Sequence, residues 1–204
     1  ESCGLYNKST LNKIGLKSNI IQKKVNIDKN IFAEGITIYK NLIFLLTYKS
    51  QKILCYDLNL NFHKMFDIQT TTGECWGITH NNKYLIISDG SNKLNFYYFP
   101  NNNTKLLKKI KEINVTYSYY DIQYINELEY VNGYIYANIW YNDHIIKIDP
   151  KNGKIINSYN FEYFKDIENT SENVLNGIAY EKSRKIFYIT GKNWKNIYKI
   201  KLLN

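Results

Sequence analysis

The sequence predicts an all-β fold of the β-propeller class, and three observations favour it. Only two prolines occur, and short apolar runs alternate with turns rich in Asn, Gly, Asp and Lys. Helical periodicity is poor along the chain. A pattern of paired strands recurs, with its equivalent positions Gly35, Gly77, Glu127 and Gly177 spaced 42, 50 and 50 residues apart. Four-stranded units at such a spacing are typical of propeller blades.

The individual strands are runs rich in Ile, Tyr, Phe and Leu, each bounded by turn residues. In chain order the clearest are LIFLLTY (42–48), KILCYDL (52–58), YLIISD (84–89), YIYANIW (134–140), HIIKID (144–149) and KIFYITG (185–191). The best candidate for a helix is the short stretch FEYFKDIEN (161–169).

Four segments share one plan, in which a polar or aromatic residue precedes a small apolar strand, a tight turn and a second apolar strand. They are EGITIYKNLIFLLTY from Glu34, WGITHNNKYLIISDG from Trp76, ELEYVNGYIYANIW from Glu127 and NGIAYEKSRKIFYIT from Asn176. In a propeller, every blade contributes the residue before its innermost strand to the same end of the central channel. We therefore expect Glu34, Trp76, Asn126 and Asn176 to converge there.

Length and charge limit the classes of function. A chain of 204 residues is long enough for one sizeable core, so a single β-propeller domain over residues 1–204 is expected. The formal net charge is +9, but the lysines are scattered and form no basic block with interleaved aromatic residues. No nucleic-acid partner is predicted. No run of about 20 apolar residues exists, so no membrane span is predicted either.

Neither the cysteines nor the histidines show a ligand pattern. Cys3, Cys55 and Cys75 are odd in number and lack the spacings of a zinc site or a disulfide framework. We expect them to be buried free thiols. The three histidines are far apart in the sequence. No metal site and no cofactor are predicted.

Several segments together resemble one enzyme family. FAEGITI (32–38), GECWGIT (73–79), INELEYVNGYIYANIW (125–140), LNGIAY (175–180) and ITGKNW (189–194) look like the plant and bacterial type of glutaminyl cyclase. The resemblance covers nearly the whole chain. It implies a five-bladed β-propeller, of which this chain supplies blades two to five and the end of blade one, with most of the first blade outside the chain.

The resemblance also implies an activity, the conversion of an N-terminal glutamine of a peptide or protein into pyroglutamate with release of ammonia. Glu34 matches the catalytic carboxylate of the family. Asn126 and Lys192 match polar groups that position the substrate and stabilise the tetrahedral intermediate. The residues that match the aromatic lining of the pocket are Phe32, Tyr48, Trp76 and Trp140. The reaction needs no metal.

The chain departs from the family pattern at two places. Tyr48 stands where the family has Trp, which keeps an aromatic side chain and adds a hydroxyl group. The family's Phe-x-Gln-Gly-Leu motif is missing, so we expect a separate or cleaved segment to supply its glutamine. The compartment is not set by the sequence, although the resemblance is compatible with a secretory route because pyroglutamate usually matures exported peptides.

Other readings of the same residues stay open. Glu34 and Lys192 can form an ion pair with a structural role, Asn126 can cap a turn, and large aromatic residues such as Trp76 are usually part of a core. A propeller that binds peptides without catalysis is one alternative function. A propeller lactonase or lyase is another, which would usually require several carboxylates around an axial metal ion.

Overall fold

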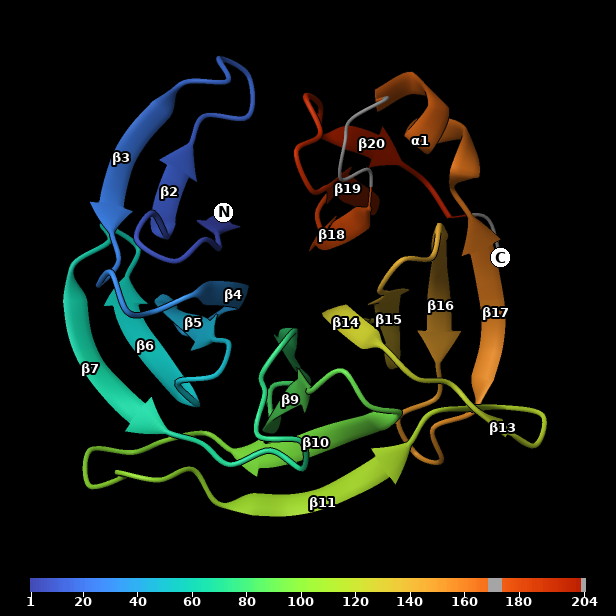
Figure 1. Ribbon diagram of the computed structural model, residues 1–204, viewed down its shortest axis with the longest axis horizontal. Coiled ribbons are helices and arrows are strands. Elements are labelled where there is room, and N and C mark those ends of the chain that lie inside the picture. Colours follow the sequence, from blue (N-terminus) through green and yellow to red (C-terminus); the bar gives the residue numbers. More distant parts are fainter. Residues whose placement is uncertain (169–173, 203–204) are drawn as a thin grey trace. The chain divides into compact units, whose positions relative to one another are not determined.

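Strands make up most of the structure, and five sheets of three or four strands follow one another along the chain (Figure 1). The computed structural model describes residues 1–168 and 174–202. The first sheet holds β1 (Ser2–Cys3), β2 (Thr10–Ile14) and β3 (Ile21–Asn26), and the second holds β4 (Ala33–Tyr39), β5 (Leu42–Thr47), β6 (Lys52–Asp57) and β7 (Phe62–Asp67).

The third sheet holds β8 (Ile78–His80), β9 (Tyr84–Ser88), β10 (Lys93–Tyr98) and β11 (Lys109–Asn114), and the fourth holds β14 (Ile125–Val131), β15 (Tyr134–Ile139), β16 (His144–Ile148) and β17 (Ile155–Asn160). The fifth sheet is formed by β18 (Leu175–Glu181), β19 (Ile186–Gly191) and β20 (Tyr198–Ile200). A small hairpin, β12 (Thr116–Tyr117) and β13 (Tyr120–Asp121), and the helix α1 (Glu162–Glu168) connect these sheets.

This series of sheets confirms the predicted all-β fold. Each of the six predicted strands is present with its ends within one or two residues, and the expected helix is α1. Residue Asn169, which closed the predicted helix, lies outside the described residues. The first sheet has three strands.

The chain packs into two compact units. The first comprises Glu1–Asp89 and Asn95–Lys111, and the second comprises Gly90–Leu94 and Glu112–Asn204. Within the first unit, β1 contacts β4 at the start of the second sheet. Within the second unit, β14 and β15 both contact β18, so the fourth and fifth sheets pack together (Figure 1).

Whether a strand lies inside its sheet or at the edge depends on how apolar its side chains are. The second strand of the second sheet, β5 (LIFLLT), is apolar on both faces, and five of its six residues are buried. The last strands are polar edges, as in β3 (IQKKVN) and β17 (IINSYN), which are mostly exposed. Lysine on an exposed edge, as in β3, opposes pairing with other chains.

The first strands of three sheets each have a β-bulge at the equivalent position, near the start of the strand. The register shifts between Ala33 and Ile36 in β4, between Ile125 and Leu128 in β14, and between Leu175 and Ile178 in β18. In the third sheet, the Ser88 carbonyl accepts a hydrogen bond from the Trp76 amide and the Ser88 amide donates one to the Gly77 carbonyl, each at 3.0 Å, which places two residues opposite one. The equivalence of the four repeats is thereby confirmed.

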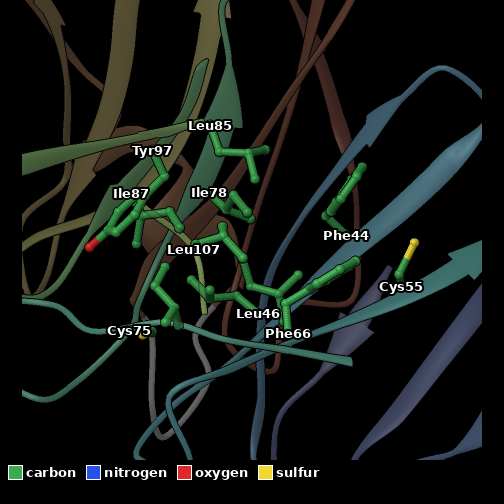
Figure 2. Close-up of a cluster of buried hydrophobic side chains, with 12 residues drawn as sticks. Phe44, Leu46, Cys55, Phe66, Cys75, Ile78, Leu85, Ile87, Tyr97 and Leu107 are labelled. Carbon is green, nitrogen blue, oxygen red and sulfur yellow. The ribbon is translucent and has the colours of Figure 1, made fainter. Parts of the chain in front are cut away.

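A hydrophobic core joins the second sheet to strands of the third within the first unit (Figure 2). Phe44, Leu46 and Phe66 pack with Ile78 and Ile87, and the last two side chains are fully buried. Burying an aliphatic or aromatic side chain of this size contributes about 1.5–3 kcal/mol each before the entropy of ordering is subtracted. A second cluster, in the second unit, contains Tyr136, Phe187 and Ile189.

The prediction of three buried free thiols is correct for two of the cysteines. Cys55 and Cys75 are free and buried, and burial raises the pKa of the Cys75 thiol to about 12. Cys3 is free but exposed, so the prediction is wrong there. It lies on the two-residue strand β1, which pairs with β2.

Candidate active site

Glu34 lies at the bulge of β4, where it and Gly35 face a single residue, Leu46, of the next strand. A bulge leaves one residue outside the regular ladder and changes the direction of its side chain. Glu34 is partly buried, and its main chain is tied to the third sheet because the Gly35 amide donates to the Trp76 carbonyl at 3.1 Å. The main chain next to Glu34, the predicted catalytic residue, is thus tied to that of Trp76, one of the predicted aromatic residues.

The remaining predicted residues of the first unit are aromatic and lie close to each other. The ring centroids of Phe32 and Tyr48 are 5.8 Å apart in an edge-to-face arrangement, and the Tyr48 amide donates to the Phe32 carbonyl at 3.0 Å. Tyr6 also packs edge-to-face with Phe32, at 5.3 Å between the centroids. These contacts bring Phe32, Glu34, Tyr48 and Trp76 together in one part of the molecule, which we call the first-unit group.

A residue that the sequence analysis missed joins two members of this group. Glu74 accepts a hydrogen bond from the Tyr48 hydroxyl at 2.9 Å and another from the Trp76 indole nitrogen at 3.0 Å. It uses a different carboxylate oxygen for each donor. The spacing of Glu74 and Trp76 could have indicated this contact. In an extended segment such as GECW, residues two apart have their side chains on the same side.

Tyr48 is a poor acid in this setting. Burial, and then the hydrogen bond to Glu74, raise the pKa of the Tyr48 hydroxyl to about 12. The negative charge of Glu34 acts in the same direction on that pKa, which is a second sign that Glu34 and Tyr48 lie close together. At neutral pH the hydroxyl is therefore protonated and acts as a hydrogen-bond donor.

The second unit holds the other three predicted residues. Asn126 lies at the bulge of β14 and is buried, and the Trp140 amide donates to the Tyr124 carbonyl at 2.9 Å. The ammonium nitrogen of Lys192 lies 4.0 Å from the centroid of the Trp140 ring, while its amide donates to the Val174 carbonyl at 2.8 Å. Lys192 and Trp140 are thus in contact, and with Asn126 they form the second-unit group.

Asn176 occupies the bulge of β18, the same step that Glu34 and Asn126 occupy in their sheets. Its side-chain oxygen is buried and has no hydrogen-bond partner within residues 1–168 and 174–202. Asn138, which faces the bulge of β14, has both amide atoms buried without a partner in the same ranges. Buried amide groups of this kind normally bind water or a ligand.

Three further side chains contact the main chain near these groups. Glu127 accepts from the amide of Leu128 at 3.3 Å, and the Glu129 carboxylate accepts from the backbone amide of Tyr180. Trp194 packs beside β19, against Gly191. The expected convergence of the first-unit and second-unit groups stays a prediction.

Within the part of the chain that the structure describes, no three His, Cys, Asp or Glu side chains lie close enough to hold a metal ion. The same residues include no helix that is both long and apolar enough to cross a membrane.

The comparisons with known proteins agree on one family. The model of the glutamine cyclotransferase family matches residues 1–202. A glutaminyl-peptide cyclotransferase of Arabidopsis thaliana is 32% identical over 99% of this chain, and the chain spans 62% of the length of that protein.

One solved structure points the same way, and a second shares only the fold. The crystal structure of Myxococcus xanthus glutaminyl cyclase superposes with a TM-score of 0.86 at 26% identity, covering 97% of this chain and 84% of that one. A protein of unknown function from Bacteroides caccae, 7% identical, shares the fold with a TM-score of 0.58 over 92% of this chain and 65% of its own. The predicted five-bladed β-propeller class is confirmed, and the chain belongs to the glutamine cyclotransferase family.

Proposed function

We propose that this protein converts an N-terminal glutamine of peptides or proteins into pyroglutamate and releases ammonia. The match of residues 1–202 to the glutamine cyclotransferase family carries the proposal. Its support from the structure is that Glu34 and Asn126 lie at the same bulge of their sheets, and that Lys192 contacts Trp140.

In the proposed reaction the α-amine of the substrate attacks the carbon of its own side-chain amide. A bond forms between the amine nitrogen and that carbon, the bond from the carbon to the amide nitrogen breaks, and ammonia leaves. Nucleophile and electrophile belong to one residue, so little entropy is lost when they approach. The barrier that remains is the transfer of protons.

Glu34 transfers these protons. Its carboxylate accepts a proton from the attacking amine and delivers one to the leaving nitrogen, which departs as neutral ammonia. General acid–base catalysis of this kind accelerates reactions about 10²- to 10⁴-fold. No metal ion takes part.

The tetrahedral intermediate carries a negative oxygen. Asn126 and Lys192 donate hydrogen bonds to it, and removing one such donor typically costs about 2.7–4 kcal/mol of transition-state stabilisation. Phe32, Tyr48, Trp76 and Trp140 surround the small amide side chain and exclude water, which strengthens the interactions of these charged and polar groups.

The test is to incubate the purified protein with a glutaminyl peptide and to follow ammonia release, with and without a chelator. We expect turnover that the chelator leaves unchanged and that Glu34→Gln abolishes. Glu181→Gln is the matched control, because Glu181 is a partly exposed carboxylate at the end of β18 that accepts from the Tyr188 hydroxyl at 2.7 Å. Peptide binding without ammonia release would instead favour a non-catalytic propeller.

A further inference from the structure

We propose that Glu74 is a positioning residue of this site, and that its carboxylate fixes Tyr48 and Trp76 relative to each other so that they bind the N-terminal glutamine. The proposal rests on the proposed function and goes beyond it, because it assigns a role to a second carboxylate that does not react. It also explains how the chain accommodates the hydroxyl group that Tyr48 introduces.

The Glu74 carboxylate bridges the side chains of Tyr48 and Trp76. One oxygen accepts from the Tyr48 hydroxyl at 2.9 Å, and the other accepts from the Trp76 indole at 3.0 Å. Hydrogen bonds to a charged acceptor are roughly twice as strong as neutral ones. Since each donor has its own oxygen, neither ring can turn without breaking a bond to the same carboxylate.

The loop that carries Glu74 is itself held in place. The Thr70 hydroxyl donates to the Glu74 carbonyl at 2.6 Å, and the Glu74 amide donates to the Thr72 hydroxyl at 3.2 Å. The Thr71 amide donates at 3.1 Å to Asp89, whose side chain is almost fully buried. The carboxylate is thus pre-organised, so little entropy is lost when it holds the two rings.

The ion pair with Lys49 does not account for this arrangement. The Lys49 ammonium lies 3.5 Å from Glu74, but the Lys49 side chain is 61% exposed, whereas that of Glu74 is 27% exposed. A pair with one such exposed partner contributes little to stability. The buried side of Glu74 faces the two ring donors, which need an acceptor when they are withdrawn from water.

The experiment compares steady-state kinetics of Glu74→Ala and Glu74→Gln with the wild-type protein, using the dipeptide glutaminyl-alanine. We expect KM to rise about tenfold for Glu74→Ala while kcat changes less than about threefold. Glu74→Gln should be intermediate, because an amide keeps one acceptor oxygen and loses the other. Glu181→Ala, which removes an unrelated carboxylate–tyrosine pair, should leave KM unchanged.

A double-mutant cycle provides a readout that a merely structural role would not move. If Glu74 acts through Tyr48, the rise in KM caused by Glu74→Gln should shrink in a Tyr48→Phe background, which lacks the hydroxyl donor. Additive effects on KM would overturn the proposal. An unchanged KM in Glu74→Gln, or a loss confined to kcat, would overturn it as well.

Binding of the dipeptide separates this proposal from the proposed function. In the Glu34→Gln background, tryptophan fluorescence should report binding of glutaminyl-alanine that Glu74→Gln weakens. If the wild type releases no ammonia, the proposed function fails, and the fluorescence titration still decides the role of Glu74. If the wild type turns over and Glu74→Gln binds the dipeptide as tightly as its parent, only the positioning role fails.

Discussion

The ammonium nitrogen of Lys192 lies 4.0 Å from the centroid of the Trp140 ring, which is a cation–π contact within the second unit. The two residues come from different sheets, since Trp140 follows β15 and Lys192 follows β19. The contact holds the flexible lysine chain against a flat surface. In the proposed reaction the ammonium group donates a hydrogen bond to the oxygen of the tetrahedral intermediate.

Lys192→Met should therefore lower kcat by about 10²- to 10³-fold, as expected for the loss of one donor to a negative oxygen. Lys192→Arg should retain more activity, because the guanidinium group keeps both the charge and the stacking on Trp140. Steady-state kinetics with a glutaminyl peptide measure both variants. Equal activity of Lys192→Met and the wild type would remove Lys192 from the reaction.

Tyr48 gives a prediction at high pH. Its pKa is about 12 in the folded protein and about 10 in an unfolded chain, so the stability it contributes is fully present below pH 10 and is lost as the pH rises through about 12. A difference titration of phenolate absorbance, wild type minus Tyr48→Phe, should show a step near pH 12. In Glu74→Ala the step should move to lower pH, because the acceptor and its charge are gone. A step near pH 10 in the wild type would contradict the assignment.

We expect the free energy of unfolding to depend on pH near neutrality because of Glu129. Burial raises the pKa of Glu129 to about 8 from an ordinary value of 4.5. Its contribution to stability is therefore fully present below pH 4.5 and is lost as the pH rises through about 8. The slope from one group cannot exceed about 1.4 kcal/mol per pH unit.

Urea unfolding at several pH values between 5 and 9 (roughly the window set by that pKa shift) measures this effect. The free energy of unfolding of the wild type should fall with rising pH relative to that of Glu129→Gln, whose amide is isosteric and does not titrate. Glu181→Gln is a suitable control because Glu181 is a partly exposed carboxylate with a lowered pKa. Parallel curves for the wild type and Glu129→Gln would show that Glu129 is ionised throughout.

A substitution of Leu46 tests how much the core shown in Figure 2 contributes to stability. Leu46 is fully buried in the cluster and lies opposite the bulge that carries Glu34. Leu46→Ala should lower the free energy of unfolding by about 2–5 kcal/mol. Leu16→Ala, at a residue that is 64% exposed, should change it by less than about 0.5 kcal/mol. Thermal or urea unfolding measures both, and similar values would contradict the burial of Leu46.

Six of the strands could be predicted from the sequence because each depends on a local pattern. The run LIFLLTY is too apolar for an exposed strand, and IQKKVN is too polar for a buried one. The repeat identified Glu34 and Asn126 as equivalent positions before their bulges were known. Each bulge adds one residue to its strand. Because the bulge occurs at the same position in every repeat, the repeats could be aligned without knowing that it was there.

The roles of Glu74 and Cys3 depended on tertiary structure. Glu74 meets Tyr48 only because main-chain contacts between separate strands, such as the hydrogen bond from the Cys75 amide to the Tyr48 carbonyl, bring the two segments together. Cys3 is exposed although it lies on a strand, β1, that pairs with β2, because no packed neighbour among the described residues covers its side chain. Local sequence sets which residues form strands, whereas the partner that a side chain meets across two strands depends on how the whole chain packs.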